Sequence, residues 1–284
     1  MDTLLVQFLI KQLKTNQLTI ITTMEMKTKM IDIHNHILVD IDDGPKNKEE
    51  MLKLLKQAKD EGVTEIIATP HHLSPTFNNE NKIVERKLNE ILDLDEVKEM
   101  GIKIYPGQEI RISDQIILQL EKGEAIGLNH SKYLLIEFPS GGVPHYTNRL
   151  FFELQSKGYV PIIAHPERNK EISQNLDVLF DLVNGGALSQ LTSASLIGKH
   201  GKKLQKISIQ MIENNLVHFI ASDAHHDTNR PFVLESLFND KKLNKYQEQI
   251  KQLINNAQQV IDNKEVRIKQ PSQDYNQKKL FGLF

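Results

Sequence analysis

The 284-residue sequence contains no cysteine and no tryptophan. The absence of cysteine excludes disulfides, thiolate catalysis and sulfur-ligated zinc or iron–sulfur sites. Basic residues number 35 and acidic residues 37, so the formal net charge is -2. Because there is no basic excess, we do not expect nucleic acid to bind through phosphate contacts alone. The notable feature of the composition is histidine, with 11 residues that cluster along the sequence.

Long hydrophobic runs are also missing. The run from Leu4 to Ile10 is interrupted by Gln7 and is too short to span a bilayer. It lacks the preceding basic residues and the following small-residue cleavage site of a secretory signal. No other segment approaches the ~18 apolar residues of a membrane helix. We therefore expect a cytoplasmic protein that does not insert directly into a membrane.

The chain is expected to have three parts. Residues 1–29 form an N-terminal extension that is either disordered or loosely helical, or that precedes a later true start. Residues 30–265 contain no linker rich in glycine, proline or serine, which indicates one domain. Residues 266–284 form a C-terminal tail whose tip, with two phenylalanines, either packs on the body or docks on a partner. The oligomeric state stays open, and a homo-oligomer is compatible with the sequence.

From residue 30 onward, short β-branched runs alternate with longer amphipathic patterns. Such repeated βα units predict a parallel sheet, either open or closed into a barrel. Asn47 is expected to cap a helix, and left-handed glycines are expected at the helix ends Gly62, Gly101, Gly158 and Gly185. The expected strands are Met30–His34, Glu65–Thr69, Lys103–Pro106, Tyr133–Phe138, Val160–Ala164, Ala187–Leu191 and Val217–Ala221. The expected helices lie near Lys48–Glu61, Asn81–Met100, Pro144–Lys157, Leu176–Asn184, Lys202–Asn214, Arg230–Phe238 and Leu243–Asn263.

Side chains that bind metals recur at the ends of these strands. In α/β folds, chemistry sits at the carboxyl ends of the strands, and parallel strands bring those ends together. The sixth expected strand is the exception, because its end offers only Thr192 and Ser193. The other strand ends carry Asp32-Ile-His-Asn-His36, His71-His72, Glu109, Glu137, His165 and Asp223-Ala-His225. We therefore expect histidines and carboxylates from distant parts of the chain to meet in one cavity.

The pair His34 and His36 alternates along an extended segment, so both imidazoles point to one side. Alone, this pair is weak evidence, because two ordinary polar residues at a strand end fit it as well. Recurrence favours a metal site, since buried imidazoles and carboxylates without an ion would repel or stay unpaired. Asp40 and Asp42 compete with Asp43 for one ligand position. The candidate ligands are His34, His36, Asp43, His71, Glu109, Glu137, His165, Asp223 and His225.

This set of candidates exceeds what one ion needs, so we expect two or three ions. Nitrogen and oxygen donors without sulfur fit Mn²⁺, Fe, Zn²⁺ or Co²⁺. A cluster of such ions clamps a phosphate and generates hydroxide near neutral pH. Because the chain has no thiol, the expected reaction is phosphoester hydrolysis in which metal-bound hydroxide attacks phosphorus.

Taken together, the motifs resemble a known family. Ile31-Asp-Ile-His-Asn-His36, followed by Asp42-Asp-Gly-Pro45, is similar to the first motif of the PHP (polymerase and histidinol phosphatase) superfamily. The resemblance covers about residues 30–260, and residues 1–29 have no counterpart in it. A narrower resemblance is to the CpsB/CapC/YwqE-type tyrosine-protein phosphatases of bacterial capsule and exopolysaccharide operons. It rests on the motifs Gly107-Gln-Glu-Ile-Arg111, Ile136-Glu-Phe138, His165-Pro-Glu-Arg168 and Arg230-Pro231.

This resemblance implies a distorted (β/α)₇ TIM-like barrel with a site for three metal ions, usually manganese. It implies cytoplasmic action on the phosphotyrosine-rich tail of a partner bacterial tyrosine autokinase, and hence regulation of capsular or exopolysaccharide synthesis. Carried over by position, it assigns all nine candidate ligands and selects Asp43 over its neighbours. It also assigns Arg168 and Arg230 to the phosphoryl group, which a guanidinium matches bidentately.

Two other functions stay open at this stage. One is a PHP-type phosphatase that acts on a small molecule such as histidinol phosphate. The other is a metal-bound scaffold that holds the kinase tail without turnover. Among neighbours of the candidate ligands, His72 and His226 are expected at the surface or behind the ligands, and Asp32 is expected to orient an imidazole. Ordinary surface or packing roles are expected for His130, His200, His218 and the solvent loop Ser140–Tyr146.

Overall fold

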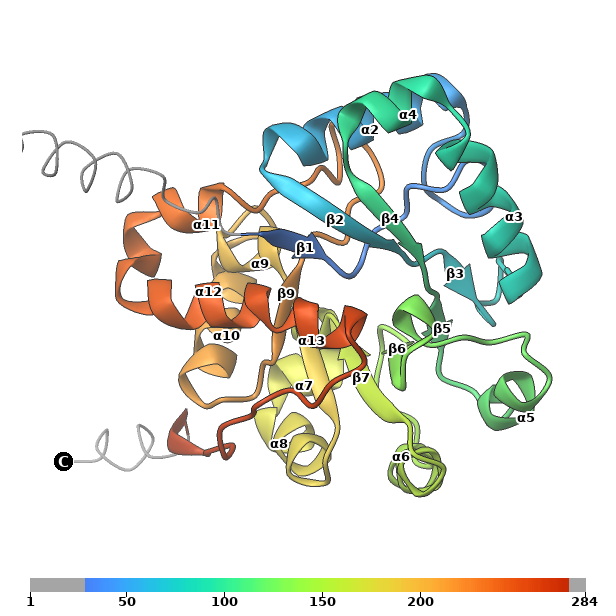
Figure 1. Cartoon of the computed structure of the whole chain (residues 1–284). Helices are drawn as coiled ribbons and strands as arrows, with labels where there is room; N and C mark the ends of the chain where they lie inside the picture. The colour runs from blue at the N-terminus through green and yellow to red at the C-terminus, as the bar shows by residue number, and fades with distance from the viewer. Residues whose placement is uncertain (1–28, 276–284) are drawn as a thin grey trace, which may run out of the picture.

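A computed structural model describes residues 29–275, in which strands alternate with helices (Figure 1). The expectations for residues 1–28 and for the tip of the C-terminal tail lie outside the described residues. Within the described part, the strands are β1 (Met30–Asp32), β2 (Val63–Ala68), β3 (His71–His72), β4 (Lys103–Pro106), β5 (Glu109–Arg111), β6 (Tyr133–Glu137), β7 (Val160–Ala164), β8 (Leu188–Thr192) and β9 (Phe219–Ala221).

The helices flank these strands on the outside of the molecule (Figure 1). In the described range, the α-helices are α2 (Lys48–Asp60), α3 (Asn81–Leu92), α4 (Asp95–Met100), α5 (Ile116–Glu121), α6 (Thr147–Ser156), α7 (Lys170–Gln174), α8 (Leu176–Asn184), α9 (Ser193–Leu196), α10 (Lys202–Glu213), α11 (Ser236–Asn239), α12 (Gln247–Asn255) and α13 (Ala257–Ile261). Short 3₁₀ helices are η1 (Leu128–His130), η2 (Pro166–Arg168) and η3 (Lys241–Tyr246).

The strands form two parallel sheets, with the orders β1-β2-β4 and β3-β5-β6-β7-β8-β9. Only Thr69 and Pro70 separate β2 from β3, and a similarly short link joins β4 to β5. Each of these pairs is therefore one segment that passes from the first sheet to the second. At the other edge, Asn35 after β1 forms a parallel bridge with Ala224 after β9. Because all these pairings are parallel, the carboxyl ends of the strands gather on one side.

Two apolar clusters hold the strands in place. Alternate strand residues face different clusters, so that Leu135 belongs to the smaller one and its neighbours Leu134 and Ile136 to the larger. The larger cluster lies under the outer helices, including α2, α3, α6, α8, α10 and α12. α13 and the segment after it pack on the smaller cluster, where the Tyr133 hydroxyl donates to the Lys264 carbonyl at 2.6 Å. Burial of each large aliphatic side chain contributes about 1.5–3 kcal/mol.

The expected strands are all present, with ends shifted by a residue or two. The short strands β3 and β5 are new, because two or three residues carry too little alternation to be recognised. Asn47 caps α2 as predicted, since its side chain accepts a hydrogen bond from the Glu50 N–H at 3.0 Å. The prediction for Gly185 is wrong, because the left-handed residue is Gly186 (φ 95°), one position later. Left-handed glycines are confirmed at Gly62, Gly101 and Gly158.

The predicted helix Arg230–Phe238 is wrong, and only its last part becomes helical, as α11. The side chains of Gln57 in α2 and of Glu61 directly after it accept hydrogen bonds from the backbone N–H groups that a helix would need. The Phe232 N–H donates to the Gln57 side chain at 3.0 Å, and the Leu234 N–H donates to the Glu61 carboxylate at 2.8 Å. An amphipathic pattern cannot reveal such tertiary competition for backbone groups.

Two other long helical predictions are each divided in the structure. The pattern Asn81–Met100 becomes α3 and α4, because Leu94 between them is extended (φ -71°, ψ 129°). This break brings α4 back to α2, where Lys48 pairs with Glu96 at 2.8 Å. The pattern Leu243–Asn263 likewise becomes η3, α12 and α13.

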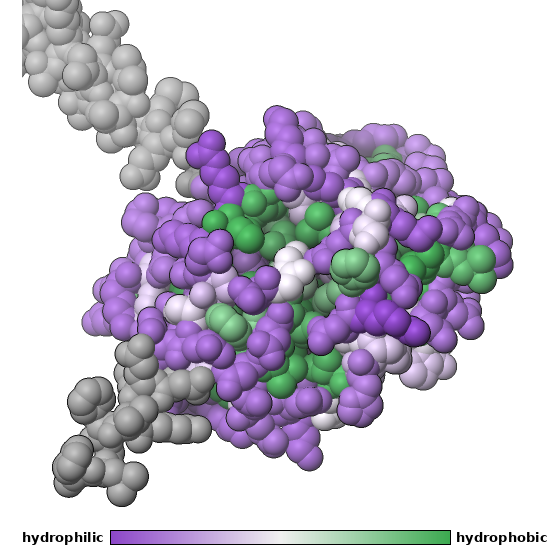
Figure 2. All heavy atoms as spheres, turned by 90° about the horizontal axis from the view of Figure 1, so that it is seen from below, coloured by the Kyte–Doolittle hydropathy of each residue, from purple (hydrophilic) through white to green (hydrophobic). Residues whose placement is uncertain are grey.

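On the face seen in Figure 2, hydrophilic side chains surround separate hydrophobic patches. Within residues 29–275, the exposed large hydrophobic side chains are Leu118, Phe152 and Ile268, on α5, α6 and the segment after α13. None of the helices in this range combines the length and apolarity needed to cross a bilayer.

Buried His218, just before β9, should make stability depend on pH. Its side chain is 3% exposed, its Nδ1 accepts the Ser189 N–H at 3.1 Å, and burial lowers its pKa to about 4. The unfolded chain takes up this proton near pH ~6.5. The neutral ring therefore stabilises the fold fully above that pH, and this contribution is lost as the pH falls towards about 4.

We expect His218→Asn to weaken this acid sensitivity, because the amide oxygen accepts the same hydrogen bond without titrating. Urea titrations of both proteins should show that the loss of unfolding free energy between about pH 7 and pH 5 shrinks by about 2 kcal/mol. An identical pH dependence of the two proteins would contradict this prediction.

Candidate metal centre

The structure brings all nine candidate ligands together at the carboxyl ends of the strands, and their role as ligands stays a prediction. Their donor atoms form four overlapping groups, in each of which the atoms lie within 4.8 Å of one another. The groups are His36-Asp43-His71-His225, His34-His36-Asp223, His34-Glu109-His165 and His71-Glu109-Glu137.

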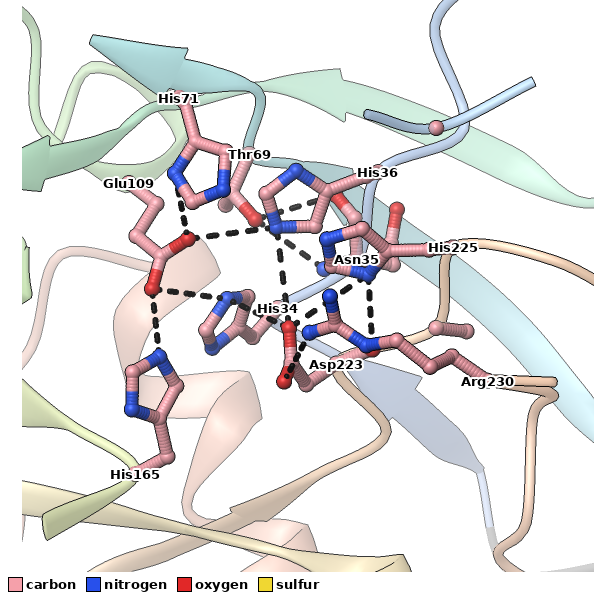
Figure 3. Close-up of polar contacts among 12 residues, drawn as sticks. His34, Asn35, His36, Thr69, His71, Glu109, His165, Asp223, His225 and Arg230 are labelled. Carbon is pink, nitrogen blue, oxygen red and sulfur yellow. Dashed lines mark hydrogen bonds and ion pairs between the residues drawn. The ribbon is translucent and has the colours of Figure 1, made fainter. Parts of the chain in front are cut away.

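The segment after β1 carries His34 and His36 and is held from both sides. The Asp223 N–H donates to the His34 carbonyl at 2.8 Å, and the Asn35 N–H donates to Thr69 Oγ1 at 3.0 Å. These contacts keep the chain extended beyond the end of the strand. Because alternate residues of an extended segment face the same side, both imidazoles enter the cluster (Figure 3).

The loop that follows His36 places Asp42 and Asp43 in different roles. Asp42 accepts the Gly44 N–H at 2.9 Å, and its Oδ2 lies 2.6 Å from His36 Nδ1. Glycine is required at position 44, since a Cβ there would lie 2.3 Å from the His36 carbonyl oxygen. This tight turn sends the Asp43 carboxylate to the donor groups, whereas Asp40 is exposed.

Glu109 in β5 occupies the middle of the cluster, where it is 1% exposed. Its Oε1 lies 2.7 Å from His165 Nε2 and 3.4 Å from His34 Nε2. Its Oε2 lies 3.0 Å from His71 Nδ1 and 3.3 Å from His36 Nε2. The carboxylate thus reaches donors on two sides (Figure 3), which is the geometry of a bridging ligand.

The other carboxylates complete the cluster. Asp43 Oδ1 lies 3.4 Å from His71 Nε2 and 3.2 Å from His225 Nε2. Asp223 Oδ1 lies 3.2 Å from His34 Nε2. Donors bound about 2.0–2.2 Å from one ion are separated by about 3–4 Å from each other. These spacings therefore suit an ion between the atoms.

Two of these residues have an unusual backbone. His165 (φ 32°) and Asp223 (φ 54°) lie in the left-handed region, which non-glycine residues seldom adopt. Hydrogen bonds hold both, because the Arg168 N–H donates to the His165 carbonyl at 3.0 Å and the Asp223 N–H is engaged by His34. Such strain clusters at functional sites and here turns both side chains into the cluster.

The two arginines assigned by the resemblance stand at the edge of the cluster. Arg230 Nη2 donates to Asp223 Oδ2 at 2.7 Å (Figure 3), and Arg168 Nη2 donates to the same oxygen. Arg230 Nη1 also lies 3.5 Å from Asp43 Oδ2. The arginines therefore fix one Asp223 oxygen and leave the other, Oδ1, to the metal-binding groups.

Supporting residues orient the imidazoles from behind. Gln190 Oε1 lies 2.7 Å from His34 Nδ1, and Asp42 Oδ2 lies 2.6 Å from His36 Nδ1. Because both oxygens accept, each Nδ1 carries the proton and each Nε2 keeps a lone pair for an ion. Sequence reasoning weighed Asp42 only as a competing ligand and missed Gln190, since a single glutamine in a strand gives no signal.

Neighbouring charges and burial raise the pKa values of two groups in the cluster, His36 and Glu137. Burial opposes charge on His36, but Asp42 raises its pKa to about 10. Burial, and then Glu109, raise the pKa of Glu137 to about 7, against the influence of Arg111 at 3.0 Å. Because ligands bind metal in their deprotonated forms, uptake of ions would release protons.

The donor chemistry fits a metal cluster. Buried polar atoms normally have hydrogen-bond partners, but most donors here do not. The nitrogen and oxygen set suits Mn²⁺, Fe, Co²⁺ or Zn²⁺. The buried atoms without a hydrogen-bond partner include His34 Nε2, His36 Nε2, Asp43 Oδ1, His71 Nδ1, Glu137 Oε2, Asp223 Oδ1 and His225 Nε2.

We expect Asp42→Asn to lower metal affinity by about 10–100-fold, because the amide holds the His36 proton less strongly than the carboxylate does. Calorimetric titration with Mn²⁺ measures this change. Asp40→Asn is the matched control, since Asp40 is exposed two residues earlier. Equal affinities of the two variants would contradict the positioning role of Asp42.

Asp32 does not orient an imidazole, so that prediction is wrong. It accepts the Ser222 N–H and hydroxyl, each at 2.7 Å, and the Asn35 amide at 2.9 Å. It thereby ties the segment after β1 to the segment after β9. His72 is completely buried, with Glu80 and Glu124 as its charged neighbours, and His226 is partly buried.

A cavity of about 350 Å³ opens beside the cluster. Ser140 and Asn169 line one side of it, and Asn169 Nδ2 donates to the Pro139 carbonyl at 2.8 Å and the Gly142 carbonyl at 3.1 Å. The predicted solvent loop is therefore anchored at the site. The cavity is also lined by Asp43, His71, Glu109, Glu137, Phe138, Ala164, His165, Arg168 and Arg230.

Known proteins with similar sequences form a consistent group. A family model described as "Capsular polysaccharide synthesis, CpsB/CapC" matches residues 30–262. The putative tyrosine-protein phosphatase CapC of Staphylococcus aureus is 57% identical over 254 residues, which cover 89% of this chain and 100% of that protein. The tyrosine-protein phosphatase YwqE of Bacillus subtilis is 41% identical over 262 residues, with coverages of 90% and 100%.

A solved structure is similar as well. It comes from a study of YwqE from Bacillus subtilis and CpsB from Streptococcus pneumoniae, described there as unique metal-dependent tyrosine phosphatases. Its TM-score is 0.80 at 39% identity, with 86% of this chain and 98% of that chain covered. The two proteins therefore share the parallel α/β architecture described above.

Proposed function

This chain belongs to the CpsB/CapC family of capsular polysaccharide synthesis, and we propose that it acts there as a metal-dependent tyrosine-protein phosphatase. The observation that carries the proposal is the convergence of nine nitrogen and oxygen donors beside a cavity that two arginines line. The family relationship indicates the substrate class, a tyrosine-phosphorylated protein, and the donor set indicates metal-dependent hydrolysis.

We also propose that residues 30–265 form the phosphatase domain as a distorted (β/α)₇ barrel. If β2–β3 and β4–β5 each count as one bent strand, residues 29–275 contain seven strands. The bridge between Asn35 and Ala224 supports closure, and the smaller apolar cluster is then the barrel interior.

In this proposal the nine residues would hold two or three ions, Mn²⁺ foremost, and Glu109 would serve more than one of the donor groups. When bound, the ions supply positive charge for the phosphate and lower the pKa of water. The protein contributes placement, since Gln190 and Asp42 fix the tautomers of His34 and His36. Most side chains of the cluster are buried, which limits the access of bulk water to it.

Arg168 and Arg230 are proposed to bind the phosphoryl group. Both line the cavity, and their side chains are 25% and 33% exposed, so each can reach an incoming phosphate. Preorganised guanidinium groups stabilise charge that develops on the equatorial oxygens. A phenolate leaving group has a pKa of about 10, so protonation by the protein is less necessary than for an alkoxide.

The proposed substrate is the phosphotyrosine-bearing tail of a bacterial tyrosine autokinase, encountered in the cytoplasm. The runner-up substrates are small phosphomonoesters such as histidinol phosphate. A scaffold that only holds the tail is disfavoured, because the donors and both arginines are all in place.

The test is hydrolysis of a phosphotyrosine peptide by the full chain with Mn²⁺, with and without a chelator, and with histidinol phosphate as the competing substrate. We expect turnover of the peptide that the chelator abolishes and that Mn²⁺ restores. Folded, metal-loaded protein without peptide turnover would contradict the proposal, and a preference for histidinol phosphate would favour the small-molecule alternative.

A further inference from the structure

A second cavity, of about 320 Å³, lies beside the end of β8 and shares Arg230 with the first. β8 is the strand whose carboxyl end carries hydroxyl groups in place of a candidate ligand. The end of β8 itself therefore supplies no candidate ligand, although Asp223 also lines this cavity. The polar residues that line the second cavity include Thr192, Lys199, His200, Thr228, Asn229 and Arg230.

The polar groups of this cavity are held in place. His200 Nδ1 lies 3.1 Å from Ser195 Oγ, which donates to the buried Glu167 carboxylate at 2.8 Å. The serine oxygen is then the acceptor for His200 Nδ1, which leaves Nε2 as the remaining polar atom of the ring. Thr192 is 1% exposed and its hydroxyl has no hydrogen-bond partner. Such an unpaired buried hydroxyl is a donor for a ligand.

The charges around this cavity favour an anion. Lys199 is exposed at its rim, and Arg230 forms its wall towards the metal centre. Asp223 is the carboxylate in that wall, and both Arg168 and Arg230 already engage it. The charge of Lys199 is therefore available to an anionic group that enters the cavity from solvent.

We infer that this second cavity is a subsite for an anionic side chain of the substrate peptide, either a carboxylate or a second phosphate. The inference rests on the proposed phosphatase function and deepens it, because it makes the flanking sequence a determinant of specificity. The two cavities share Arg230, and an extended peptide spans about 3.3–3.6 Å per residue. The anion therefore lies within about three residues of the phosphotyrosine.

The experiment compares phosphotyrosine peptides that carry one glutamate, at each position up to about three residues on either side, with matched glutamine peptides. A phosphoserine peptide at the preferred position separates phosphate from carboxylate. p-Nitrophenyl phosphate measures the basal reaction, since it is too small to reach the second cavity. The variants are Lys199→Glu and, as a matched control, Lys203→Glu on the exposed side of α10.

At one of these positions, we expect the wild-type chain to prefer the glutamate peptide by about fivefold in kcat/KM, through KM. Lys199→Glu should abolish or reverse that preference and leave p-nitrophenyl phosphate turnover within about twofold, whereas Lys203→Glu should retain it. Equal kcat/KM for the glutamate and glutamine peptides at every position, or an equal loss of the glutamate preference in both variants, would overturn the subsite. Turnover of p-nitrophenyl phosphate in the same experiment would still support the phosphatase function. No turnover of any aryl phosphate would overturn both proposals.

Discussion

Glu109→Gln should reduce phosphotyrosine hydrolysis by about 10³-fold and remove at least part of the bound metal. Glu109 is 1% exposed, and its two oxygens face His165 and His34 on one side and His71 and His36 on the other. Glutamine keeps the size of the side chain, but it replaces one oxygen with an amide nitrogen that cannot bind a cation. The variant should therefore lose the bridging donor without leaving a hole.

The measurement combines metal analysis after dialysis against Mn²⁺ with steady-state turnover. Glu65→Gln is the matched control, because Glu65 is a buried glutamate, 3% exposed, near the amino end of β2. Among the described residues it contacts Lys29, Lys103 and Tyr105, and no contact with a candidate ligand is found. Full metal content and activity in Glu109→Gln would contradict its bridging role.

Arg168→Ala should lower kcat by about 10²–10³-fold while metal content stays unchanged. His165→Ala, three residues earlier, should instead lower metal affinity by more than about tenfold. The two side chains differ in position. His165 Nε2 lies against Glu109 within one donor group, whereas Arg168 contacts Asp223 Oδ2, and it is the other oxygen, Oδ1, that lies 3.2 Å from His34 Nε2. The pair thus separates ion binding from phosphoryl binding.

Metal titration and single-turnover kinetics measure the two effects independently. Arg168→Lys is a useful third variant, because it keeps the charge but loses the planar fork that matches phosphate. We expect it to recover only part of kcat. Equal metal loss in Arg168→Ala and His165→Ala would contradict the division of roles.

The sequence predicts the strands and the convergence of the nine side chains, because both depend on local pattern. Short β-branched runs mark the longer strands, and the residues that follow each strand end can be read directly from the sequence. The sequence does not predict the backbone structure where residues distant in the chain compete for backbone hydrogen bonds. The segment after Arg230 is not helical, because Gln57 and Glu61 take its backbone donors.

Support behind the ligands is equally hidden. Gln190 lies 156 residues from His34 in sequence, and only the fold places its amide against that ring. Asp32 has the right phase to face an imidazole, yet the hydroxyl and amide of Ser222 reach it first. Residue type and spacing therefore predict which side chains meet, whereas their hydrogen-bond partners depend on tertiary packing.

Anomalous diffraction from crystals grown with Mn²⁺, recorded on both sides of the manganese edge, tests the central claim most directly. We expect two or three peaks per chain, one of them within bonding distance of both a Glu109 oxygen and a histidine nitrogen, at about 2.0–2.3 Å. If protein that hydrolyses phosphotyrosine showed no peak among the nine side chains, or bound its only ion elsewhere, the metal centre described here would be contradicted.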